Sequence, residues 1–578
     1  MGPSSDNPAA LVAGDGARQA NVTDVLAEVG RMAVALAVEA GLDAELSAAI
    51  GHEVEFAIAR AGLRALTPGL VRELTMAVLA ERGVSDSLLR ARTRVGLTVA
   101  DAERLVRGAL TASNAAPQNP AGTDRAIAAA IKREYALHAI FSEKVASAHL
   151  AGDIHIEKIG EPDRLFSITQ PAPLWSESTR ADARQHAEPA LALIGAETRA
   201  LAAYISGEIV WDGFNWMLAG QFGEEGTSEQ VLAERAFDVL ADALDNASCE
   251  RVVLHLDWDP PAHLGADPNR AAPARRLMRA MLDAPRRPAH VESSCLLVVH
   301  VTPQWGSAHA YREALDATAR AAAAGRRVRV ALDREGHSPW LTRYGASFRR
   351  GAPPRSFCVG RMCLNLVRLA HAEGQSEEKF AGGLTRAAEL AAQAHLEKRV
   401  FIEKLMALGN KGALARLAQR DGAKPFLRLD RATHHISPVG LGEATRLLAG
   451  GEDETARARR ILEQLTHEAE RLSAAHKIRF LISPSRSQAA PARFARLDQR
   501  REARAIAPAR AYSNALSLAG EKVARDHFAR TRDDGALHLE ALFDADVHLN
   551  ATGADPKQLA VLISRAFYQT TAAALLFN

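Results

Sequence analysis

Cysteine is the residue type in this chain with the widest chemical range, and there are four, Cys249, Cys295, Cys358 and Cys363. None forms a Cys-x-x-Cys pair, and the number is too small for a secreted disulfide framework, so we expect a reducing cytoplasmic setting. Cys358 and Cys363 lie five apart in SFCVGRMCLNLVRLA. On a regular strand an odd spacing places two side chains on opposite faces, which favours buried structural thiols over a reactive pair.

Histidine and serine offer the next candidates. His149 and His155 have no third ligand near them in the sequence, and His434 and His435 should point to opposite faces of a strand, so we predict no metal site. The segment SPSRS over 483–487 follows a predicted strand end, where hydroxyls bind phosphate or simply cap a loop. The chain holds no phosphate loop, no His-Glu-x-x-His and no Gly-x-Ser-x-Gly motif, which disfavours the common kinase and hydrolase classes.

The elements that must position these residues alternate along the chain. Short Val/Ile/Leu-rich runs at 251–258, 295–302, 326–333 and 477–484 predict strands. Helical periodicity between and after them covers 227–247, 270–285, 308–324, 376–409, 452–476 and 519–531. Segment 489–510 is rich in Ala and Arg and fits a helix or a loop. Strands separated by helices predict an α/β fold with a largely parallel sheet, and about 450 residues suit a closed barrel.

The first 98 residues are predicted to form a separate small helical unit. Apolar residues recur at helical spacing over 22–41, 44–62 and 67–83. Before them, LVAGDGAR over 11–18 carries the turn signal Gly14-Asp15-Gly16 and suggests a β-hairpin. Residues 99–124 include a stretch rich in Asn, Pro and Gly, which predicts a linker, so the larger domain spans 125–578.

Composition narrows the function classes. The 578 residues carry 71 basic and 69 acidic side chains, so no overall field draws the chain to nucleic acid or to an acidic membrane. No start signal for export and no apolar run of about 20 residues is present, so we expect a soluble cytoplasmic protein.

Several segments in order resemble the anaerobic, class III ribonucleoside-triphosphate reductases of the glycyl-radical enzyme superfamily. They are KREYALHAIFSEKVASAHLAGDIHIEKIG at 132–160, the run from GRMCLNLVRLA at 360–405, ISPVGLGEA at 436–444, RFLISPSRSQAAPARFARLDQRR at 479–501 and AYSNALSLAG at 511–520. The resemblance implies an α/β barrel over 125–578, threaded by a finger loop. It also implies that residues 1–98 are a degenerate ATP-cone, since the usual Lys-Arg before its Asp-Gly is missing from LVAGDGAR.

The resemblance carries specific site residues with it. It implies a nucleotide pocket with Asn365, Asn514 and the hydroxyls of Ser483, Ser485 and Ser487, the serines holding phosphate. In the cone it implies ATP or another nucleoside triphosphate at Gly14, Asp15 and Gly16. Relatives of this family form homodimers, so the same is implied here.

Relative to the family, the chain departs at the residues of the radical pathway. The finger-loop Gly-Cys-Arg corresponds to Gly345-Ala346-Ser347, so Ala346 stands where the family has its thiyl cysteine. The C-terminal zinc cysteines and the Arg-x-x-Gly-Tyr radical loop are not found, the last glycine being Gly553. The second thiol expected after the His-Ile-His-Asp-like segment is also missing from EKIGEPDRLFSITQ, where Glu157 stands in the family's usual aspartate region.

Three functions follow as hypotheses. The first is a non-catalytic homologue that binds nucleotides and acts as a sensor, scaffold or partner subunit. The second is a split reductase that makes deoxyribonucleotides with a separate glycyl-radical subunit and a radical-SAM activase, using Cys358 or Cys363 as the thiyl site. The third is a structural or nucleic-acid-interacting protein that uses the Arg-rich segment 489–510; interspersed acidic and aliphatic residues make a solvated helix the better interpretation and nucleic acid an unexpected partner.

Overall fold

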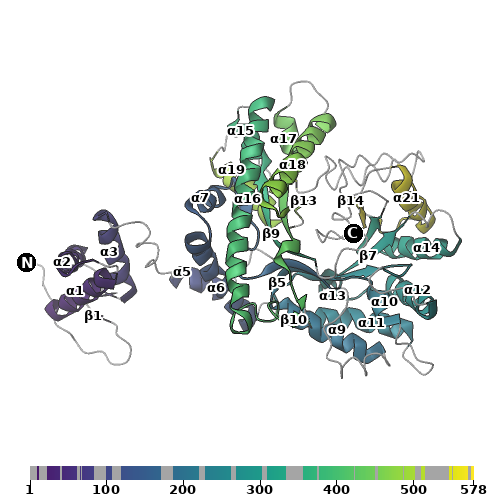
Figure 1. The fold of residues 1–578 in the computed structure, drawn as a ribbon, viewed down its shortest axis with the longest axis horizontal. Helices are drawn as coiled ribbons and strands as arrows, with labels where there is room; N and C mark the ends of the chain where they lie inside the picture. Colours follow the sequence, from purple (N-terminus) through teal and green to yellow (C-terminus); the bar gives the residue numbers. More distant parts are fainter. Residues whose placement is uncertain are drawn as a thin grey trace, which may run out of the picture. The chain divides into compact units, whose positions relative to one another are not determined.

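Figure 1 shows the computed structural model of the chain, which forms two compact units, 1–99 and 100–578. The structure describes residues 10–11, 22–39, 42–61, 65–66, 68–83, 99–106, 119–170, 187–219, 228–245, 247–261, 268–302, 309–333, 356–373, 376–421, 424–448, 454–485, 487–501, 510–513, 546–549, 551–569 and 574–577. Each unit is considered by itself.

The first unit is a three-helix cluster, as its periodicity predicts. Helices α1 (Val22–Glu39), α2 (Ala44–Ala61) and α3 (Pro68–Glu81) pack around a core that includes Val29, Ile50, Val54 and Leu79. Strand β1 (Ala10–Leu11) pairs in parallel with β2 (Ala65–Leu66). Leu11 therefore pairs with a strand from between α2 and α3 instead of a local hairpin partner, and the rest of the predicted hairpin, with Gly14, Asp15 and Gly16, lies outside the described residues.

The second unit begins with helices that include part of the predicted linker. Helix α5 spans Val99–Val106, and α6 (Pro120–Tyr135) starts at the cap Asn119, whose side chain accepts a hydrogen bond from the Gly122 amide at 2.8 Å. A π-helical turn, Ala136–Ile140, leads to α7 (Glu143–Ala151) and the short strand β3 (Ile154–Ile156).

Five parallel strands form the first half of a large sheet. They are β4 (Leu165–Gln170), β5 (Ile205–Trp211), β6 (Arg251–Leu256), β7 (Cys295–Val301) and β8 (Val328–Leu332). The intervening helices are α9 (Ala187–Ala202), α10 (Phe214–Ala219), α11 (Glu229–Ala243), α12 (Pro268–Asp283), α13 (Ala289–Ser294) and α14 (His309–Ala323). The three strands predicted in this half lie where the apolar runs placed them.

The second half runs in the opposite direction. Strand β9 (Phe357–Asn365) is antiparallel to β4, and β12 (Ala432–Val439) and β13 (Arg479–Ile482) run parallel to β9. At the other side β15 (Ala574–Phe577) is antiparallel to β8 and pairs in parallel with β14 (Asp546–Leu549). The connecting helices are α15 (Leu366–Ala372), α16 (Glu377–Ala407), α17 (Leu441–Leu447), α18 (Glu454–His476), α19 (Ala489–Arg501) and α21 (Pro556–Gln569). The β10–β11 pair (Arg420–Asp421 and Lys424–Pro425) forms a separate small hairpin.

The strand order is β13-β12-β9-β4-β5-β6-β7-β8-β15-β14, with β3 beside β9. Seven of the ten strand pairings described in this sheet are parallel, which confirms the expected largely parallel sheet, and the antiparallel pairs β9–β4 and β15–β8 join segments that run in opposite directions. Helix α16 packs on β9, α18 on β13 and α9 on β5, all visible in Figure 1. Apolar side chains form a large core between these helices and the sheet.

The opposite face of the sheet, called here the inner face, has its own small apolar cluster. It consists of Val210, Val253, Leu296, Val298, Ala331 and Leu576, which alternate along their strands with residues of the helix-packed core. No helix among the described residues is long and apolar enough to cross a membrane.

Candidate functional site

Strand β9 brings both candidate cysteines to the same face of the sheet. Cys358 pairs with Thr433 of β12, and Cys363 pairs with Ser437, four residues further along β12. Because paired residues share a face and an even spacing on β12 keeps that face, both thiols lie on one side. The prediction of opposite faces is wrong because β9 advances two residues, from Cys358 to Gly360, while β12 advances one, a bulge that changes the alternation.

This shared side is the inner face. A Cβ atom placed on Gly360 would lie 3.3 Å from the Nζ atom of Lys398 on α16, so Gly360 faces the helix and Arg361 faces away from it. The Arg361 guanidinium lies 4.4 Å from the centre of the Phe166 ring, and its Nη1 atom is 3.3 Å from Oε2 of Glu157. Arg361 and Glu157 are both buried, which makes this a buried ion pair.

The serines predicted to hold phosphate lie beside this pair. The Ser483 hydroxyl is 2.9 Å from Nδ1 of His435 and 3.4 Å from the hydroxyl of Ser437. The Ser485 hydroxyl donates to the Ser487 carbonyl at 3.4 Å and also hydrogen-bonds the thiol of Cys363. The structure therefore brings together Cys363, Ser483, Ser485 and Ser487.

Ser487 caps the loop, which is one of the two roles that the sequence allowed for these hydroxyls, the other being phosphate binding. Its hydroxyl accepts a hydrogen bond from the Ala489 amide at 3.1 Å, at the start of the 13-residue helix α19. It also hydrogen-bonds the side chain of Glu157. A loop of hydroxyls before a helix N-terminus favours the binding of an anion, whereas the carboxyl group of Glu157 disfavours it there.

Burial controls the protonation of this cluster. It raises the pKa of Glu157, while the neighbouring Arg361 works in the opposite direction. Burial likewise raises the pKa of the Cys358 thiol to about 11 and shifts the pKa of the Cys363 thiol upward. Both thiols therefore stay protonated at neutral pH and are poor nucleophiles.

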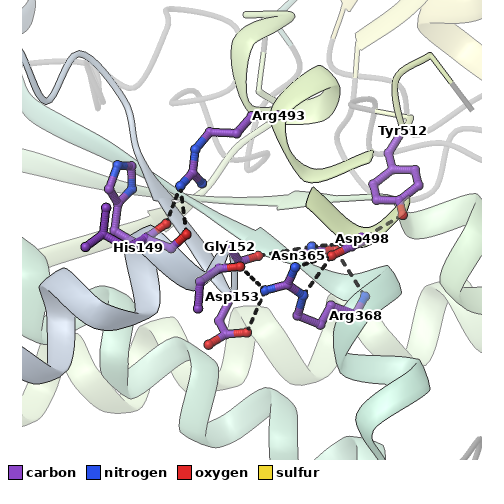
Figure 2. Close-up of polar contacts among 10 residues, drawn as sticks. His149, Gly152, Asp153, Asn365, Arg368, Arg493, Asp498 and Tyr512 are labelled. Atoms are coloured by element: carbon purple, nitrogen blue, oxygen red, sulfur yellow. Dashed lines mark hydrogen bonds and ion pairs between the residues drawn. The ribbon is translucent and has the colours of Figure 1, made fainter. Parts of the chain in front are cut away.

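Asn365, a predicted nucleotide-pocket residue, is held by the chain itself. Figure 2 shows Asn365 among Gly152, Arg368 and Asp498. Its Oδ1 atom accepts from the Arg368 amide at 3.1 Å and caps α15, and its Nδ2 atom donates to the Gly152 carbonyl at 3.1 Å and to Asp498 at 2.9 Å. These three bonds account for the amide group's oxygen and both of its N–H donors.

Asp498 is the centre of this network. Besides Asn365 it accepts from Nε of Arg368 at 2.7 Å, from Nη2 of the same guanidinium and from the Tyr512 hydroxyl at 3.1 Å. Arg368 also donates to the Ala151 carbonyl, and Arg493 donates to the His149 carbonyl at 2.5 Å (Figure 2). The two arginines thus tie the end of α7 to α15 and α19. Nothing in the helical run RLDQRR distinguishes Asp498 from a solvated carboxylate, so its place in this network could not be predicted from the sequence.

The histidines behave as ordinary buried groups. The Nδ1 atom of His149 accepts from the Ile156 amide at 3.2 Å. His434 lies 5.3 Å, ring centre to ring centre, from His395 of α16, whereas His435 faces Ser483, so the two neighbours do point to opposite faces. Among the residues that the structure describes, no three metal-binding side chains come together.

The remaining site predictions fall where the structure gives no description. Ala346, Asn514, Gly14, Asp15 and Gly16 all lie outside the described ranges. Their roles stay predictions.

All four cysteines of the sequence, by contrast, are described, free and buried. The Cys358 thiol donates to the Gly360 carbonyl at 3.1 Å, and the Cys249 thiol donates to the Gly207 carbonyl at 3.4 Å. Cys295 opens strand β7 in the helix-packed core. Burial raises the pKa of Cys249 and that of Cys295 to about 12. None of the four is exposed to solvent.

The sequence and the fold are both similar to those of known proteins. The sequence model described as anaerobic ribonucleoside-triphosphate reductase matches residues 288–575. No curated protein matches the chain. The fold is similar to that of the anaerobic ribonucleotide reductase from Thermotoga maritima with citrate in the active site, at a TM-score of 0.62 and 13% identity, over 83% of this chain and 93% of that one.

Two further solved structures agree. The Thermotoga maritima enzyme with dATP bound in the specificity site has a TM-score of 0.61 and 13% identity, over 82% of this chain and 86% of that one. A structure described as anaerobic ribonucleotide reductase has a TM-score of 0.62 and 12% identity, covering 87% and 86%. The two opposed halves of the sheet are therefore those of the reductase barrel, and the sequence match identifies the chain as a member of the anaerobic ribonucleoside-triphosphate reductase family.

Proposed function

We propose that this chain is a nucleotide-binding member of the reductase family that carries out no radical chemistry of its own and acts as a sensor, scaffold or partner subunit. The observation that carries the proposal is the state of its thiols. All four cysteines are buried, and the two on the inner face are engaged with their surroundings, Cys358 with the Gly360 carbonyl and Cys363 with Ser485. A thiyl step needs a sulfur atom about 3–3.5 Å from the reacting carbon.

Nucleotide binding is supported by the loop after β13. Ser483, Ser485 and Ser487 lie at the carboxyl end of that strand and before the N-terminus of α19, where phosphate groups are favoured by backbone amides and by the helix dipole. The Glu157 carboxyl opposes an anion at this loop, and the Arg361 guanidinium, 3.3 Å from it, offsets that charge. In this proposal residues 1–98 are a cone-like unit that binds ATP, and the protein is a homodimer.

The binding half of the proposal is tested by thermal unfolding of the full chain with ATP, GTP, CTP or UTP at millimolar concentration. A nucleotide at about 100 times its dissociation constant stabilises the folded state by about 2.7 kcal/mol, so the unfolding midpoint should rise with at least one of them. Ser485→Ala should reduce that rise, while the exposed Ser293→Ala on α13 should leave it unchanged. No rise with any of the four would contradict nucleotide binding.

The second candidate is the split reductase, and one contact favours it. The Cys363 thiol hydrogen-bonds Ser485 and so lies beside the proposed phosphate loop. Incubation of the full chain with a radical-SAM activase, a glycyl-radical subunit and labelled ribonucleoside triphosphates distinguishes the two. We expect no deoxyribonucleotide. Product that disappears in Cys363→Ala or in Cys358→Ala would establish the reductase instead.

A further inference from the structure

Four polar side chains lie in a row on the inner face, apart from the cluster around Cys363. Asp212 follows β5, His255 lies on β6, His300 on β7, and Asp333 follows β8. Each comes two residues after a member of the apolar inner cluster, the preceding positions being Val210, Val253, Val298 and Ala331. Since these strands are parallel neighbours, the row follows the carboxyl edge of the first half of the sheet.

The four side chains are in hydrogen-bond contact or close to it. Nδ1 of His300 is 2.5 Å from Oδ2 of Asp333, and Nε2 of His300 is 2.8 Å from Nδ1 of His255. The same His255 atom is 3.6 Å from Oδ1 of Asp212. His255 is fully buried and His300 nearly so, while the Asp333 side chain is 25% exposed. The row thus runs from the interior to a carboxylate that reaches solvent.

Other charged groups on this face are at a distance. Glu208 and Arg251 form a pair at 3.4 Å, and Arg329 is buried on β8. Each stands four residues before a member of the row, about 13 Å along a strand at about 3.3 Å per residue. The buried Asp257 is closer, two residues after His255 and so about 7 Å further along the chain, whereas the two aspartates of the row lie within 3.6 Å of a ring nitrogen.

The contacts define one consistent arrangement of protons. With Asp333 ionised, His300 donates through Nδ1–H, which leaves its Nε2 lone pair to accept from Nδ1–H of His255. A proton added at Nε2 of His255 is then balanced by transfer of its Nδ1 proton to His300 and of the His300 Nδ1 proton to Asp333. The donor loses one proton, Asp333 gains one, and both imidazoles end neutral with exchanged tautomers.

We propose that His255, His300 and Asp333 form a proton relay that accepts a proton from a hydroxyl group of a ligand inside the barrel fold, with Asp212 positioning the His255 ring. A hydroxyl suits the row better than an anion, because carboxylates stand at both ends. It also suits the row better than a metal ion, because the ring nitrogens point at each other. The ribose of a nucleotide carries such hydroxyls, so the ligand, though not the relay, rests on the proposed function.

The relay is tested without any ligand by hydrogen–deuterium exchange at the C2 position of each histidine in the full chain, followed by mass spectrometry from pH 4 to 9. Asp333→Asn should change the exchange profile of His300 and also that of His255, although Asp333 contacts only His300 of the two rings. Asp283→Asn, which removes a surface carboxylate paired with Arg320, is the matched control and should shift neither.

A second variant separates a relay from simple Coulomb attraction. In a His300→Gln background the Asp333→Asn shift at His255 should disappear, because the connecting ring is gone. An equal shift in both backgrounds, or no shift at His255 in the single variant, would overturn the relay. Adding ATP tests the ligand separately: slower C2 exchange at His255 in wild type supports a hydroxyl donor there. Unchanged exchange when ATP raises the unfolding midpoint overturns that ligand assignment, and failure of ATP to bind counts against the proposed function only.

Discussion

Replacing Asn365 by Ala separates a structural role for this side chain from a role in binding substrate. The change removes the cap of α15, worth about 1 kcal/mol, and deprives Asp498 and the Gly152 carbonyl of buried donors, at about 1–3 kcal/mol each. Because these losses overlap, we expect a total of about 3 kcal/mol. The assay is urea unfolding of the full chain followed by circular dichroism, in which the midpoint should fall.

Asn365→Asp makes the expectation sharper. The new carboxyl retains the acceptor that caps α15 but places a second buried acid against Asp498. Destabilisation at pH 7 should equal or exceed that of the alanine variant, and it should lessen at pH 5, where the introduced carboxyl, once protonated, could donate to Asp498. The matched control is Asn410→Ala in the exposed turn Gly409–Lys411, which should change stability by less than about 0.5 kcal/mol.

An unchanged midpoint for Asn365→Ala, combined with weaker binding of nucleotide, would refute this reasoning. It would mean that the three hydrogen bonds are dispensable and that the amide serves a ligand, as the family resemblance implies.

Two further predictions concern packing and acid stability. Gly382→Ala, on the exposed side of α16, should stabilise the protein by about 0.5–1 kcal/mol. Gly383→Ala should destabilise it by about 1–3 kcal/mol, because the new Cβ would lie 2.6 Å from a methyl of Leu369. Thermal melts of the two variants check both expectations, and equal melting temperatures would be inconsistent with the packing of α15 on α16. Burial lowers the pKa of His149, His155 and His434 from 6.5 to about 2 or 3, so the unfolded chain binds protons that the folded chain does not. The free energy of unfolding should be level above about pH 7 and fall from about pH 6 toward pH 3, by up to about 4 kcal/mol per pH unit for the three together. Urea midpoints that stay constant from pH 7 to 4 would contradict these values.

The sequence was informative where a single segment determines its own structure. Strands β6 and β7 are continuous apolar runs, and α16 and α18 show a long helical period, so all four could be placed from local pattern. Strand β5 escaped notice because Gly207 and Glu208 interrupt it. The glycine is required there, since a Cβ would lie 2.7 Å from the Phe166 carbonyl of β4, a constraint set by a neighbouring strand.

The site depends on contacts that no local pattern records. One extra residue in β9 relative to β12 moves Cys358 to the face of Cys363, and a bulge of this kind has no signature in SFCVGRMC. Likewise Asp498 is recognisable as a structural residue only through its hydrogen bond with Arg368, which is 130 positions away along the chain. The serine loop was found because it follows a strand and precedes a helix, both of which the sequence displays.

In the folded protein all four thiols of this chain are buried, and none is open to a reagent in solvent. The most direct measurement is alkylation of the native full chain with iodoacetamide at pH 8, with each cysteine quantified by peptide mass spectrometry. We predict four unmodified cysteines in the native protein and four modified ones in 6 M guanidinium, since burial keeps every thiol inaccessible and protonated. Modification of native Cys363 or Cys358 at the rate of a free thiol would contradict the account.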